Sequence, residues 1–154
     1  MDQLTDHNLV ARVLLTLVTA VYGIGVMIAD TNKTHVTNPL WTPHARFHCV
    51  WQILSYSGLA LAAWALIWWP GPLPVARLYL AAGLAAVVLV SFYLAFALIG
   101  LYGGSNYDVN GIVPKRFQLG PVTLSLDPNT VVFSIATVLL IAGVSQIVGA
   151  AFPG

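Results

Sequence analysis

Four long stretches of the sequence contain no Asp, Glu, Lys or Arg, and this feature restricts the available folds more than any other. The stretches cover residues 13–29, 47–76, 78–107 and 128–154 and are 17, 30, 30 and 27 residues long. A helix needs about 20 predominantly apolar residues to cross a bilayer. Only 7% of the residues are charged, whereas an ordinary soluble domain has about 25%. The sequence therefore predicts an integral, multi-pass membrane protein.

Turn and capping residues between these stretches predict where the helices begin and end. Thr42 followed by Pro43 is typical of a helix N-cap with proline at the first helical position, and the Pro-Gly-Pro-Leu-Pro run at 70–74 predicts a tight turn. We expect an all-α fold, a four-helix transmembrane bundle that forms a single membrane domain over residues 1–154. Its helices are expected at about residues 9–29, 43–69, 75–101 and 129–151.

The loop at residues 102–128 is the longest polar segment. Within it, residues 116–126 alternate in polarity around Gly120 and Pro121, as a β-hairpin does. The first and third loops of a four-span chain lie on the same membrane face. We therefore expect a small hairpin between the third and fourth helices that covers one end of the bundle, above the first loop. The first and third loops hold four basic residues against two on the other side, which favours their placement in the cytoplasm.

Charge and cysteine content exclude several classes of function. The net charge of +1, without a basic cluster, lacks the electrostatic surface that nucleic-acid binding requires. The single cysteine, Cys49, excludes an intramolecular disulfide and a thiolate metal cluster, and is expected to be a small buried side chain. The first apolar stretch follows an N-terminus that contains Asp2 and Asp6 and no early Lys or Arg, and no cleavage pattern closes it, so it is interpreted as a retained helix and not a signal peptide.

Titratable side chains gather where the first span meets the second. Asp30 is the only carboxylate that adjoins the first span, and His35, His44 and His48 follow it within 18 residues. The fourth histidine, His7, is assigned no role. His44 and His48 are four residues apart, hence on one helical face. Ionisable groups at membrane depth are costly and are functional by default.

The same face of the second helix continues with Gln52 and Ser55, and the stripe from His44 covers about 16 Å of the helix axis. Facing lipid, these groups would lack partners, so we expect them to face the interior of the bundle. They predict a cavity whose mouth lies beside the first loop. The residues expected to bind a substrate there are Asn32, Asn38, Trp41, Trp51, Gln52, Ser55 and Tyr93.

Three interpretations of this cluster remain open. In the first, Asp30, His35, His44 and His48 perform acid–base catalysis on a lipophilic substrate without a cofactor, as in an isomerase, a cyclase or an epoxide-opening enzyme. In the second, His35, His44 and His48 hold one divalent metal ion. In the third, the polar residues organise the loop of a non-catalytic membrane subunit or lipid-binding module. In each case the expected partners are a lipophilic small molecule or lipid and the bilayer, and small residues on the helices would also permit a homo-oligomer.

The segment 29–48 reads Ala-Asp-Thr-Asn-Lys-Thr-His-Val-Thr-Asn-Pro-Leu-Trp-Thr-Pro-His-Ala-Arg-Phe-His. It resembles the signature of a family of small four-helix membrane proteins from bacteria and fungi, which carry Asp-x-Asn-x-Thr-His and Asn-Pro-x-Trp-x-x-His-Ala-x-Phe-His between their first two helices. That resemblance implies the fold and no activity.

In size and number of spans the chain is also similar to sterol-isomerase-like and DoxX-like four-helix proteins. The former place acidic residues and a histidine in an intramembrane pocket. The chain has no glutamate, so this resemblance implies a pocket and a lipophilic ligand but not a reaction.

Overall fold

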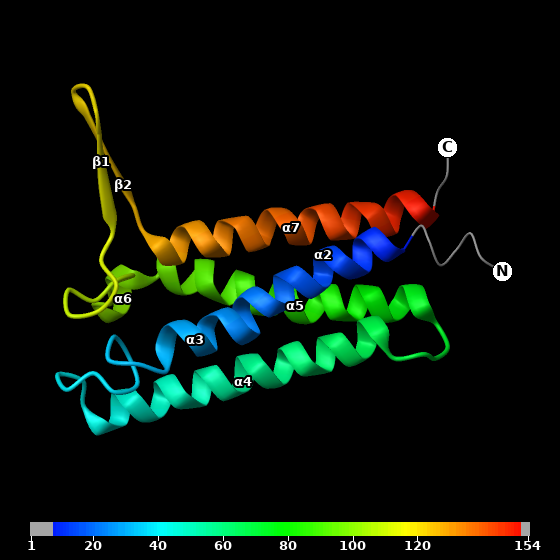
Figure 1. Cartoon of the computed structure of the whole chain (residues 1–154), viewed down its shortest axis with the longest axis horizontal. Helices are drawn as coiled ribbons and strands as arrows, with labels where there is room; N and C mark the ends of the chain where they lie inside the picture. The colour runs from blue at the N-terminus through cyan, green and yellow to red at the C-terminus, as the bar shows by residue number, and fades with distance from the viewer. Residues whose placement is uncertain (1–7, 152–154) are drawn as a thin grey trace.

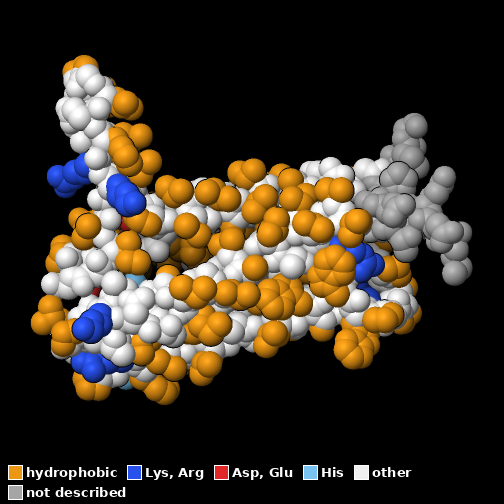
Figure 2. All heavy atoms as spheres, viewed as in Figure 1, with side chains coloured by type: hydrophobic (Ala, Val, Ile, Leu, Met, Phe, Trp, Pro, Cys, Tyr) orange, Lys and Arg blue, Asp and Glu red, His pale blue; other side chains and the backbone are white. Residues whose placement is uncertain are grey.

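Four long apolar helices run side by side in the computed structural model, which describes residues 8–151 (Figure 1). Each is long and apolar enough to cross a membrane, and their apolar side chains cover the length of the bundle, with basic side chains at its two ends (Figure 2). The predicted four-helix bundle is confirmed. The first span is Leu9–Asp30, followed by α4 (Pro43–Trp68), α5 (Pro74–Ala97) and α7 (Pro128–Ala151).

Helix caps fix the starts of α4 and α7. The Thr42 hydroxyl accepts a hydrogen bond from the Ala45 amide at 3.2 Å, and Pro43 follows it, as the sequence predicts. The Asp127 carboxylate accepts a bond from the Thr130 amide at 2.8 Å, directly before Pro128. Both caps lie at the same end of the bundle, where the first and third loops meet it.

The third span is shorter than predicted. It was expected to continue to about residue 101, but α5 ends at Ala97 and a separate turn, α6 (Ile99–Tyr102), follows. The Tyr102 hydroxyl donates to the Ala95 carbonyl at 2.9 Å, so this carbonyl in the last turn of α5 has a hydrogen-bond partner. Gly103 then adopts a left-handed φ of 66° and ends α6.

The first span contains a wider turn that the sequence pattern did not predict. It consists of α2 (Leu9–Ala20), a π-helical turn η1 (Val21–Gly25) and α3 (Val26–Asp30). A π-turn inserts one residue, which rotates the residues after it by about 100° around the axis. The Ser57 hydroxyl of α4 donates to the Gly23 carbonyl at 3.2 Å, so the neighbouring helix satisfies the loosened backbone.

Gly23 is where this turn touches α4. A Cβ at Gly23 would overlap the Cβ of Ala60, so only glycine permits this approach. Gly83 of α5 differs, because an added Cβ there meets no atom within 4 Å. Of these two glycines, only Gly23 is required by packing.

Hydrogen bonds close the opposite end of the bundle. The Arg12 guanidinium donates to the carbonyl of Ile67, and that of Arg77 donates to the carbonyl of Ala65 at 2.8 Å. Trp64 donates to the Thr19 hydroxyl at 2.7 Å. These bonds join α2 and α5 to the last turns of α4, whose carbonyls favour positive charge.

The predicted β-hairpin is present, but it does not cover the end of the bundle. β1 (Lys115–Leu119) pairs antiparallel with β2 (Val122–Leu126), and Gly120 makes the turn with a φ of 59°. Every residue of both strands is exposed, and the hairpin extends away from the bundle across the direction of the helices (Figure 1). The expectation that the hairpin covers the end of the bundle is wrong, because residues of the loop before β1, and not the strands, pack against the first loop.

Replacing Gly23 with alanine is expected to lower the free energy of unfolding in detergent by about 1–3 kcal/mol, because the new methyl group forces η1 and α4 apart. The matched control is Gly83→Ala, where the methyl group meets open space and the better helix propensity of alanine leaves stability unchanged or slightly raised. Denaturant unfolding followed by circular dichroism measures both. Equal stability of the two variants would contradict the packing role of Gly23.

Candidate functional site

A pocket of about 940 Å³ opens at the end of the bundle where the two capped helices begin. Its wall includes residues of η1, α3, α4, α5 and α7, together with both loops on that side. Pockets of this size hold small-molecule ligands. The cavity predicted beside the first loop is therefore found in the structure.

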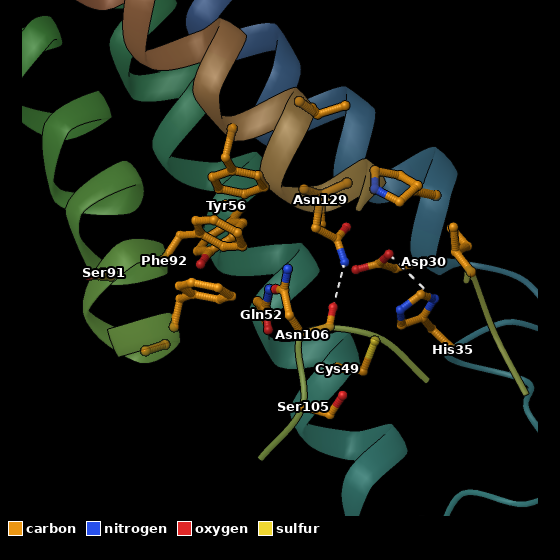
Figure 3. Close-up of a pocket in the computed structure, with 18 of the residues that line it drawn as sticks. Asp30, His35, Cys49, Gln52, Tyr56, Ser91, Phe92, Ser105, Asn106 and Asn129 are labelled. Carbon is orange, nitrogen blue, oxygen red and sulfur yellow. Dashed lines mark hydrogen bonds and ion pairs between the residues drawn. The ribbon is translucent and has the colours of Figure 1, made fainter. Parts of the chain in front are cut away.

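Asp30 and His35 face each other at one side of this pocket (Figure 3). Asp30 is the last residue of α3, and His35 lies in the loop that follows. Their carboxylate oxygen and ring Nδ1 are 3.6 Å apart, and the side chains are 17% and 21% exposed, respectively. The π-turn matters here, because it sets the rotation at which α3 presents Asp30.

Thr34 orients the histidine ring. Its hydroxyl oxygen is 2.8 Å from His35 Nδ1 and 2.7 Å from the side-chain oxygen of Asn32. A hydroxyl has one proton to donate. When Thr34 donates this proton to Asn32, the hydrogen between Thr34 and His35 must come from the ring, on Nδ1. The Asp30 carboxylate lies near the same nitrogen and favours the same tautomer. Nε2 is then the lone-pair nitrogen of His35, free to act as a base.

Asn32 and Asn38, both expected to bind substrate, fold the loop instead. The Asn32 amide donates to the Ala29 carbonyl at 2.8 Å, and its oxygen accepts from the Thr34 amide at 2.8 Å. Asn38 is 1% exposed, and its oxygen accepts from the Leu40 amide at 3.0 Å. Neither lines the pocket. They hold the backbone on which His35 is placed.

The polar stripe of α4 divides between the pocket and the outer surface. His48 and Gln52 line the pocket, as predicted, and Cys49 and Tyr56 line it beside them. His44, Ser55 and Trp51 are exposed and do not line it. The pocket-facing side of α4, which includes Ala45, Cys49 and Tyr56, is shifted by about one residue toward the C-terminus from the predicted stripe.

Tyr93 does not reach the pocket either. Its hydroxyl lies 3.3 Å from the hydroxyls of Ser134 and Thr137, and it joins α5 to α7. Trp51 packs against Phe47 and His48 on the outside of α4, with 59% of its surface exposed. Both were expected to bind substrate, and in the structure both have other contacts.

The wall opposite Asp30 is aromatic. Phe92 of α5 and Phe133 of α7 stack with their ring centroids 4.2 Å apart, and Phe96 and Tyr56 extend this surface. Figure 3 shows Tyr56 and Phe92 across the pocket from Asp30 and His35. The pocket therefore has one apolar side and one titratable side.

The third loop completes the mouth of the pocket. The Trp41 indole donates to the Asp108 carboxylate at 2.6 Å, so the first and third loops are tied together. The hydrogen bonds from Trp41 and from the backbone amide of Asn110 hold the pKa of the Asp108 carboxyl below its ordinary value.

Ser105, Asn106 and Asn129 also line the mouth, and sequence reasoning did not select them. The Asn129 amide donates to the Asn106 carbonyl at 3.1 Å, and the Asn106 amide donates to Asp127 at 2.7 Å. From the sequence, this region predicts only the start of the fourth helix at about residue 129, because nothing in the sequence shows that the third loop lies near Asp30.

The three histidines proposed as metal ligands form two separate groups. His44 Nε2 is 3.1 Å from His48 Nε2, while His35 pairs with Asp30 and packs edge-on against Trp41. Across residues 8–151, no group of three or more His, Cys, Asp or Glu side chains is placed to hold a metal ion. The alternative of a metal site formed by His35, His44 and His48 therefore finds no such cluster among the described residues.

Residues 14–111 match a family of unknown function (DUF6640). This segment is more than half of the chain and includes the Asp30–His48 region, so the protein belongs to that family. No curated protein and no solved structure matches the chain. The likeness to sterol-isomerase-like and DoxX-like proteins stays a prediction.

Trp41→Phe is expected to raise the pKa of Asp108, because it removes the indole hydrogen bond that favours the carboxylate. Because the pKa of Asp108 is lowered in the folded state, the ionised carboxylate stabilises the contact between the loops at pH values above the ordinary carboxyl pKa. This stabilisation is lost as the pH falls through the lowered pKa. Carboxyl-detected NMR titration measures the shift. Trp51→Phe is the matched control, and an equal pKa of Asp108 in both variants would refute the assignment.

Proposed function

We propose that this protein is a membrane enzyme that binds a lipophilic molecule with a polar end and transfers a proton by means of Asp30 and His35. The observation that carries the proposal is that this pair lies in the same pocket as an aromatic wall. A protein that only binds a lipophilic molecule does not need an acid–base pair such as Asp30 and His35 in its pocket.

The shape of the pocket supports the ligand class. Apolar rings or chains pack favourably against Phe92, Phe96 and Phe133, and hydrophobic lining with a few polar groups is typical of small-molecule sites. Gln52, Asn106 and Asn129 supply hydrogen bonds for a polar end. An amphiphile fits this division, with its apolar part between α5 and α7 and its polar part beside the first loop.

The orientation of His35 supports the chemistry. With hydrogen on Nδ1, Nε2 removes a proton from the ligand, and the Asp30 carboxylate stabilises the imidazolium that forms. Return of that proton to a different atom of the ligand moves a double bond, or assists ring closure or epoxide opening. His48, on the wall formed by α4, is the second acid–base group of the pocket.

Ligand binding is tested by filling the pocket. Ala95 lines it and is exposed, so Ala95→Trp is expected to abolish co-purification of the bound molecule, as read by mass spectrometry of protein extracted in mild detergent. Ala97→Trp is the matched control, since Ala97 is exposed on the same helix outside the pocket. Equal ligand content in the two variants would show that the molecule binds elsewhere.

Catalysis is tested with the molecule so identified. Asp30→Asn and His35→Asn are expected to retain it but to lower its turnover by about 10²–10⁴-fold, the usual contribution of general acid–base catalysis. Lys33→Gln, an exposed change in the same loop and outside the pocket, serves as the control. Wild-type turnover in both acid–base variants would disprove the role of the pair, and no product from the wild type would make the protein a lipid-binding module.

A further inference from the structure

The β-hairpin has one apolar face and one polar face. Side chains alternate across a strand, and the register pairs Phe117 with Leu124 and Leu119 with Val122. These four side chains therefore share a face, which Leu126 and its cross-strand partner Lys115 extend toward the helices. The five apolar side chains of this face are between 38% and 64% exposed. The opposite face carries Arg116, Gln118, Thr123 and Ser125.

The position of the hairpin relates it to the membrane. β2 ends at Leu126, and the fourth span begins at Pro128, so the root of the hairpin lies at the end of a membrane span. From there the hairpin extends across the direction of the helices, which places it along the membrane plane (Figure 1). It therefore lies at the level where hydrocarbon meets headgroups.

The apolar face of the hairpin is turned toward the side on which the helices lie. Figure 2 shows its hydrophobic side chains on the side that looks along the length of the bundle, toward the exposed apolar side chains of the helices. Two basic residues, Lys115 and Arg116, begin β1 at the root of the hairpin, one on each face. Basic residues beside an apolar face are typical of segments that lie in the membrane interface.

We propose that the hairpin is a membrane-interface anchor that rests Phe117, Leu119, Val122, Leu124 and Leu126 on the lipid at the hydrocarbon–headgroup boundary. This explains why an amphipathic hairpin stands apart from the bundle with its apolar side uncovered by protein. The proposal is independent of the proposed function, since none of the strand residues lines the pocket.

Spin labels on the two faces test the proposal in the full chain. Leu124→Cys and Thr123→Cys are adjacent residues of β2 on opposite faces, introduced in a Cys49→Ala background and labelled with a nitroxide. The protein is reconstituted in vesicles of phosphatidylcholine and phosphatidylglycerol. At position 124, collisions with oxygen, which concentrates in lipid, should exceed those with a water-soluble nickel chelate, and at position 123 the order should be reversed.

Two results would overturn the proposal. Equal access of the nickel chelate to both positions would place the hairpin in water. Loss of access by both reagents at position 124 would mean that protein, such as a second copy of the chain, covers the face. Leu119→Cys and Gln118→Cys repeat the comparison on the two faces of β1. Agreement between the two strands shows the orientation of the whole hairpin, whereas disagreement shows a local disturbance by one label.

Discussion

A bilayer core offers a protein no hydrogen-bond partners, and the arrangement of this chain follows from that constraint. The π-turn of the first span is tolerated because Ser57 reaches the Gly23 carbonyl across the helix interface. That contact requires α4 to come close, and the absence of a side chain at Gly23 permits it. The π-turn also sets the direction in which the Asp30 side chain leaves α3. A backbone irregularity, a helix contact and the position of a carboxylate thus depend on one another.

Much of the fold could be predicted from the sequence because hydropathy and caps are local properties. The four spans, the start of α4 at Pro43 and the hairpin around Gly120 each depend on a few neighbouring residues. The gathering of Asp30 and His35 near one pocket also follows from short sequence separation. His48 and Gln52 reach the pocket because an i, i+4 pair shares one face of α4.

The rest could not be predicted because it depends on contacts between distant segments. A helical stripe shows which residues share a face, but only the neighbouring helices decide which part of that face points inward, and here His44 and Ser55 fall outside the pocket. The hydrogen bond between Trp41 and Asp108 joins two residues that are 67 positions apart in the sequence, one in each loop. Alternation predicts a hairpin and says nothing about the direction in which it leaves the bundle.

The contacts of Arg12 and Arg77, at the end of the bundle away from the pocket, bear on how the proposed ligand would exchange. Arg12 and Arg77 hold α2 and α5 to the last carbonyls of α4, so three spans are fixed to one another far from the pocket. Widening of the bundle is then confined to the opposite end, where the loops meet through Trp41 and Asp108. The residence time of a ligand would be governed by the opening of those loops, and much less by separation of the spans along their length.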